Sequence, residues 1–112
     1  MKPFDDLIRM TENAVKYHYG YADVASLRAM VAMRPAGEVI EYHADRGTPL
    51  FDRAHRVHIP LVNVPMCDFY IEGEIIPMNI GTIVEINNKK MHKVENYSIL
   101  DRLHFICDVE PA

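Results

Sequence analysis

Glycine and proline residues interrupt the chain every few positions after Pro35, and this spacing limits what the sequence can fold into. The interrupting residues are Gly37, Gly47, Pro49, Pro60, Pro65, Gly73, Pro77 and Gly81. Between them lie short runs rich in Val, Ile and Tyr, at 38–44, 55–64, 67–72, 82–87, 91–96 and 102–109. Short strands separated by turn residues are typical of an all-β sandwich or barrel. The pattern therefore predicts a β-barrel or jelly-roll core over residues 33–112.

The N-terminal part, residues 1–32, has a different texture and is predicted to be a helical segment. Apolar side chains recur at intervals of three and four over residues 4–18, which indicates an amphipathic helix, and Gly20 is a plausible end for it. Residues 22–33 suit either a second short helix or a strand that begins near Leu27. With 112 residues and no visible linker, the chain is predicted to be one domain, 1–112.

Charge and composition exclude several classes of partner. The formal net charge is −4, whereas nucleic-acid binding usually needs a basic face. The apolar stretches, such as residues 59–66, are far shorter than the ~20 residues of a membrane span. Cys67 and Cys107 do not make a disulfide framework and suit a reducing compartment. We therefore expect a cytoplasmic protein that binds neither nucleic acid nor membrane.

Two histidines and one carboxylate on the predicted strands suggest a metal site. His43 and Asp45 lie two positions apart, so they project from one face of a strand, and His92 opens a later strand. Alone, each is more simply a solvated strand end. Together they supply the ligand set of the facial triad that holds non-haem Fe(II) with open coordination positions.

Basic residues on neighbouring strands suggest an anion beside that metal. Arg102 follows His92 by ten residues and shares a strand face with His104, Ile106 and Asp108. An inward-facing guanidinium needs an anionic partner, which is either a ligand carboxylate or a structural salt bridge to Asp101, Asp108 or Glu110. Arg56 and His58 form another same-face pair, whose simpler interpretation is a polar strand edge.

The order of these features resembles the aspartyl/asparaginyl β-hydroxylase family of Fe(II)- and 2-oxoglutarate-dependent dioxygenases. The resemblance runs from Met33 to Val109. It rests on the segments His43-Ala44-Asp45-Arg46-Gly47, Arg56-Val57-His58-Ile59-Pro60-Leu61 and Gly73-Glu74, on the spaced residues Met78, Gly81, Glu85, Asn87, Asn88, His92, Val94 and Asn96, and on Asp101, Arg102, His104, Ile106, Asp108 and Val109. It implies a mainly β double-stranded β-helix, a cupin-like jelly roll with a short N-terminal helical segment.

The resemblance also implies roles for individual residues. His43, Asp45 and His92 would hold Fe(II), as in the proline 3-hydroxylase-like members, which keep the carboxylate. Arg102 would pair with the distal carboxylate of 2-oxoglutarate, and Arg56 and His58 would also contact this cosubstrate. Arg46 and Asn63 are speculative substrate contacts.

The implied reaction is hydroxylation of an unactivated C–H bond with O₂ as cosubstrate and release of succinate and CO₂. The substrate would be an amino acid or a peptidyl aspartyl, asparaginyl or prolyl side chain. The sequence leaves open whether the chain forms a homo-oligomer. Two alternatives are a non-catalytic jelly-roll binding module and a cupin-type metalloenzyme that does not use 2-oxoglutarate. Arg102 argues against the second, because such sites usually use more histidines and contain no partner for an interior arginine.

Overall fold

The computed structural model describes the chain except residues 1, 45–52, 63 and 88. Within that part of the chain, one helix precedes eight strands. They are α1 (Lys2–Tyr19), β1 (Val24–Arg34), β2 (Val39–His43), β3 (His55–Val62), β4 (Cys67–Ile71), β5 (Glu74–Ile76), β6 (Val84–Ile86), β7 (His92–Asn96) and β8 (Arg102–Pro111). No helix among the described residues has the length and apolar character needed to cross a membrane.

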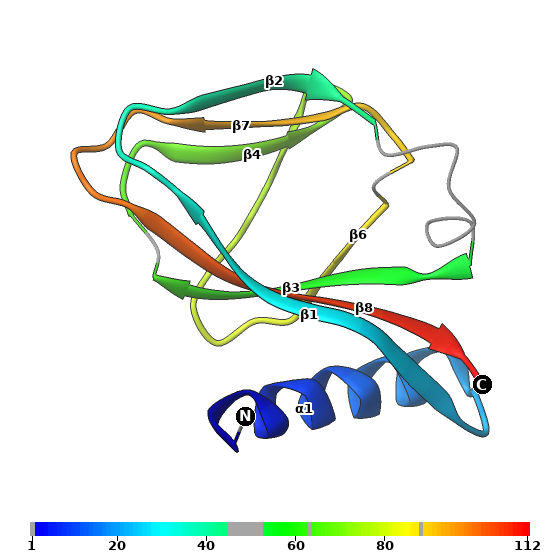
Figure 1. Cartoon of the computed structure of the whole chain (residues 1–112). Coiled ribbons are helices and arrows are strands. Elements are labelled where there is room, and N and C mark those ends of the chain that lie inside the picture. The colour runs from blue at the N-terminus through cyan, green and yellow to red at the C-terminus, as the bar shows by residue number, and fades with distance from the viewer. Residues whose placement is uncertain (1, 45–52, 63, 88) are drawn as a thin grey trace.

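The described strands form two antiparallel sheets that face each other (Figure 1). Sheet I has the order β1-β8-β3-β6, and sheet II has the order β2-β7-β4-β5. Most strands that pair are therefore far apart in sequence, as in β1 with β8 and β2 with β7, whereas β4 and β5 form a local hairpin. This alternation of strands between two sheets is the jelly roll, so the predicted mainly β double-stranded β-helix is confirmed.

The first strand corrects the predicted extent of the helical segment. The helix ends at Tyr19, beside the predicted end at Gly20, and residues 24–34 form strand β1 and not a second short helix. Ten residue pairs join β1 to β8, from Val24 opposite Pro111 to Arg34 opposite Arg102. Long-range backbone pairing therefore decides the structure of a stretch whose local pattern also suited a helix.

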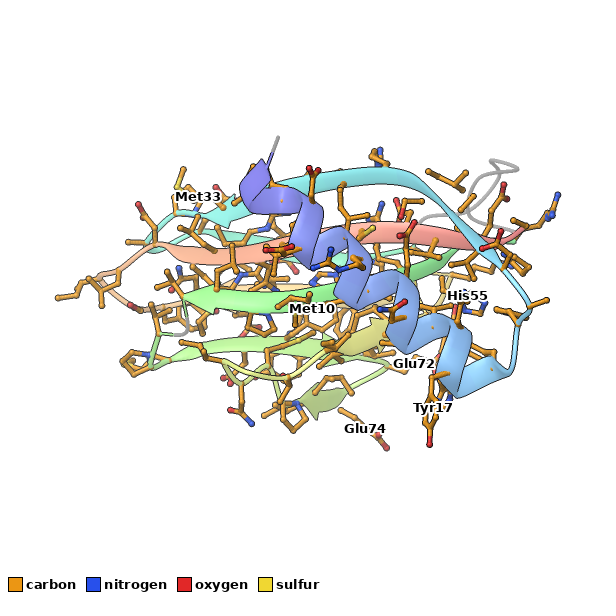
Figure 2. The ribbon with its side chains drawn as sticks, turned by 90° about the horizontal axis from the view of Figure 1, so that it is seen from below. Met10, Tyr17, Met33, His55, Glu72 and Glu74 are labelled. Atoms are coloured by element: carbon orange, nitrogen blue, oxygen red, sulfur yellow. The ribbon has the colours of Figure 1, made fainter. Side chains whose placement is uncertain are left out.

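Helix α1 lies across the outer face of sheet I (Figure 2). Its Val15 packs with Val57, Phe105, Cys107 and Val109 in one buried cluster. Phe4 stacks on Phe105 with ring centroids 6.0 Å apart. The apolar stripe of the helix thus covers the outward-facing residues of β3 and β8.

The inner face of β8 carries polar residues into the space between the sheets. Along this strand Arg102, His104 and Asp108 alternate with Phe105 and Cys107, and all five are buried. A smaller apolar cluster of Phe69, Ile86 and Val94 lies on the strands that enclose this space. The polar site and this second core therefore share one layer between sheets I and II.

Candidate functional site

His43 and His92 lie side by side at one edge of the space between the sheets. They are directly opposite each other in the β2–β7 pairing, and their ring centroids are 4.3 Å apart. The Nδ1 atom of His43 donates to the Glu41 carbonyl and that of His92 to the Lys90 carbonyl, each at 2.8 Å. A carbonyl only accepts, so in each neutral ring Nε2 carries the lone pair. Metal-binding histidines are oriented by bonds of this kind.

The third predicted metal ligand, Asp45, lies outside the described residues, as do the two speculative substrate contacts Arg46 and Asn63. Within the described part of the chain, no group of three His, Cys, Asp or Glu side chains is placed to hold a metal ion. The described geometry therefore brings together two of the three predicted ligands.

Arg102 lies deep between the sheets without a carboxylate partner among the described residues. Only 4% of the residue is exposed, and its buried Nε makes no hydrogen bond within that part of the chain. Burial lowers the pKa of Arg102 to about 10, and the nearby Arg34 guanidinium adds to this effect. A buried, unneutralised guanidinium is costly, so its presence here indicates an anionic ligand.

The carboxylates that could have formed a structural salt bridge with Arg102 are engaged elsewhere. Asp101 accepts a hydrogen bond from the Ala36 backbone N–H at 2.9 Å, and Glu110 lies 4.0 Å from Arg53. Asp108 pairs with Arg56 and Arg28, as described next.

Arg56 forms a two-pronged ion pair with the fully buried Asp108. Its Nε donates to Oδ1 at 2.8 Å and its Nη2 to Oδ2 at 3.0 Å, while Arg28 approaches the same Oδ2 at 3.2 Å. This pair ties β3 to β8 and β1 between the sheets. Arg56 also lines the cavity described below, and its contact with a cosubstrate stays a prediction.

Arg34 is a site residue that the sequence reasoning missed. It lies opposite Arg102 in the β1–β8 pairing, lines the same cavity, and its buried Nε has no hydrogen-bond partner in the described part of the chain. Glu38 Oε1 lies 3.8 Å from Arg34 Nη1 and offsets part of the repulsion between the two neighbouring guanidiniums, and an anion bound beside them would offset more of it. Only the β1–β8 register reveals this residue, because nothing in the local sequence marks it.

His58 and His104 form a buried imidazole pair in the same layer. They join through their Nδ1 atoms at 3.0 Å, and 5% and 0% of the residues are exposed. Burial lowers the pKa of His58 well below its ordinary value and that of His104 to about 3, and Arg102 adds to both shifts. Both rings are therefore neutral at pH 7, and one Nδ1 donates to the other. The sequence placed His104 on this face without giving it a role.

One cavity of about 70 Å³, here called the small cavity, borders the histidine pair, His58 and the three arginines of the site. It is lined by Arg34, Ile40, His43, Arg56, His58, Phe69, Ile86, His92, Val94, Arg102 and Ile106. All five of the predicted metal- and cosubstrate-binding residues that the structure describes border it. An anion reaching from the histidine pair to Arg102 would lie within this space.

The buried imidazoles make stability depend on pH. As pH falls below about 6.5, unfolded chains take up protons on these histidines while folded His104 resists until about pH 3. The unfolded state then binds more protons, so the free energy of unfolding falls by up to about 1.4 kcal/mol per pH unit for each histidine.

Denaturant titrations at several pH values should show a shallower pH dependence of the free energy of unfolding for His104→Gln. The exposed-site variant His18→Gln should keep the original slope, and equal slopes in all three proteins would contradict this prediction.

Comparison with known structures shows which fold the chain shares with other proteins. A non-heme monooxygenase, ThoJ, solved as a nickel complex, has a TM-score of 0.69 at 18% identity, covering 88% of this chain and 49% of that chain. A Cupin 2 conserved barrel domain protein from Salinispora arenicola has a TM-score of 0.52 at 11% identity, covering 77% and 73%. This chain thus spans about half the length of the monooxygenase chain. Fold and comparisons together define a cupin-like jelly roll.

The sequence identifies the family within that class. The family described as aspartyl/asparaginyl beta-hydroxylase matches residues 8–111, and the chain belongs to it. The match starts at residue 8, so it includes most of α1 and all of β1 as well as the part that resembles the family by its motifs. No curated protein matches the chain significantly.

Proposed function

We propose that this protein is a hydroxylase that uses Fe(II), 2-oxoglutarate and O₂. The observation that carries the proposal is the small cavity, which has two paired histidines and a buried arginine without a carboxylate partner in the described residues on its walls. Family membership supports the hydroxylase-type reaction. For the substrate we propose an amino acid or a peptidyl aspartyl, asparaginyl or prolyl side chain, as the family resemblance implies.

The histidine pair fits a divalent metal. Each Nδ1 hydrogen is held by a backbone carbonyl, so both rings offer an Nε2 lone pair in a fixed orientation. His43 and His92 would hold Fe(II), with Asp45 proposed as the third ligand. Two neutral imidazoles and one carboxylate suit ferrous iron, and they leave positions open for other ligands.

Arg102 fits the distal carboxylate of 2-oxoglutarate. Its guanidinium presents donors in a planar fork that matches a carboxylate, and its burial strengthens the interaction. Arg34, beside it in the β1–β8 register, adds a second positive charge to the same wall. The Arg56–Asp108 ion pair holds the Arg56 guanidinium at the cavity wall, so that little reorganisation is needed when the ligand binds.

Bound iron and cosubstrate would supply the activation of O₂, which no amino-acid side chain provides. The protein binds and orients the two groups and keeps water away from them. At the cavity wall His58 presents a neutral ring, which is hydrogen-bonded to His104 and packs edge-on against Phe69 with ring centroids 5.7 Å apart.

Metal content tests the histidine assignment. After anaerobic loading with Fe(II), or with Co²⁺ as a stable probe, the unaltered protein should retain stoichiometric metal. His43→Ala and His92→Ala should each weaken metal binding by at least about 100-fold, because each removes a ligand, a larger loss than that of an outer-shell partner. The matched control is His18→Ala, which removes an exposed histidine of α1 and should bind metal normally. Undiminished metal in the His92 variant would remove this residue from the ligand set.

A further inference from the structure

A second and larger cavity lies on the other side of Arg102. This cavity, here called the large cavity, measures about 280 Å³ and runs along β4 and β5 to the segment 77–79. Its wall includes Cys67, Phe69, Ile76, Met78, Arg102 and His104. Within the described residues it shares only Phe69 and Arg102 with the small cavity, and neither His43 nor His92 borders it. It is therefore a separate space from the proposed iron site.

One buried polar atom on the wall of the large cavity has no hydrogen-bond partner among the described residues. His104 is fully buried, and its Nε2 makes no hydrogen bond to any described part of the chain. The buried Nε of Arg102 lacks a partner in the same way. Buried polar atoms in folded proteins are almost always hydrogen-bonded, and those that are not point to a missing group. A ligand that accepts hydrogen bonds from both residues would satisfy them.

The rest of the wall defines the body of that ligand. Ile75, Ile76, Pro77 and Met78 give the large cavity an apolar side, which suits a hydrocarbon group. Asp68 also borders it and would repel a second negative charge. We propose that the large cavity binds a small monocarboxylic acid with a branched or aromatic apolar body, its carboxylate at Arg102 and His104. This inference goes beyond the hydroxylase reaction, and it shares Arg102 with the proposed cosubstrate site.

The imidazole pair gives this binding a specific signature. A carboxylate only accepts hydrogen bonds, so His104 must then carry its proton on Nε2. Its Nδ1 becomes the acceptor of the His58–His104 bond, and His58 must donate from Nδ1. Because His58 borders the small cavity, the proton arrangement of this pair links the two cavities.

Isovalerate is a suitable probe, with its neutral isostere isovaleramide as the matched control. Titration of the ¹⁵N-histidine-labelled protein should place the His104 proton on Nε2 when isovalerate saturates. Isovaleramide should bind at least about tenfold more weakly, since charge-assisted hydrogen bonds are roughly twice as strong as neutral ones. Isovalerate should bind more weakly when 2-oxoglutarate is present, because both carboxylates use the Arg102 guanidinium that borders the two cavities. Binding that leaves the His104 nitrogens unchanged would overturn the proposal.

Two surface variants keep the test independent of changes in the buried pair. Ile75→Asp puts a negative charge on the wall of the large cavity, at a residue that is 58% exposed. Ile80→Asp makes the same change at a residue that is 63% exposed and does not border the cavity. Isovalerate binding should weaken by about tenfold in the first variant through charge repulsion and remain unchanged in the second. Equal affinities in the two variants, or no isovalerate binding by the unaltered protein, would rule out the site.

Discussion

Replacing Arg102 by methionine is expected to weaken 2-oxoglutarate binding by about 10²- to 10³-fold, because it removes one partner of a buried, charge-assisted interaction. The same change should stabilise the ligand-free protein. Arg102 is 4% exposed and has no carboxylate partner in the described residues, so an apolar side chain of similar volume avoids the desolvation cost of its guanidinium. Replacement of buried charges in this way raises the free energy of unfolding by up to about 1–4 kcal/mol.

These opposite effects separate a binding role from a structural one. Calorimetric titration with 2-oxoglutarate and denaturant unfolding of the ligand-free protein measure them. Arg53→Met is the control, because the Arg53 side chain is 69% exposed and its ion pair with Glu110 is long, at 4.0 Å. We expect little change in either quantity for that variant. A clear loss of stability in Arg102→Met together with normal 2-oxoglutarate affinity would mean that Arg102 is a structural residue.

The second large effect is expected at Asp108. This fully buried carboxylate pairs with both Arg56 and Arg28. Its removal takes away the negative charge that balances these two guanidiniums. Asp108→Asn should lower the free energy of unfolding by about 3–5 kcal/mol, as is usual when one member of a buried ion pair is removed.

A surface ion pair provides the comparison for that variant. Asp6 pairs with Arg9 at 2.7 Å on α1, where both side chains are mostly exposed. Asp6→Asn should therefore cost no more than about 1 kcal/mol. Denaturant unfolding of the two variants under the same conditions gives the comparison. If Asp108→Asn cost as little as Asp6→Asn, the buried pair would not be holding sheet I together.

The sequence supports the fold class because its strands and breaks are local features. Alternation along residues 102–109 correctly separates Arg102 and His104 from Phe105 and Cys107. The short strand β5 was not predicted, because its hairpin turn has positive φ at Glu72 (48°) as well as Gly73 (85°). A two-residue turn of this kind favours Asn-Gly or Asp-Gly, so Glu-Gly gives a weak signal.

The candidate site depends partly on pairings that no local pattern contains. The residues His43, His92 and Arg102 could be selected from their spacing and from the family resemblance. The Arg34–Arg102 neighbourhood and the His58–His104 bond arise only when β1 and β3 pair with β8. Sequence separation between these partners is large, so their proximity is a property of the jelly-roll topology.

Anaerobic addition of Fe(II) and then 2-oxoglutarate, followed by visible absorption, tests the central claim most directly. The claim is that one cavity holds the metal at His43 and His92 and the cosubstrate at Arg102. It predicts a weak visible band that requires both additions, saturates at stoichiometric amounts, and is lost in His92→Ala. A folded protein that shows no band when both are in excess, or the same band without His92, would contradict it.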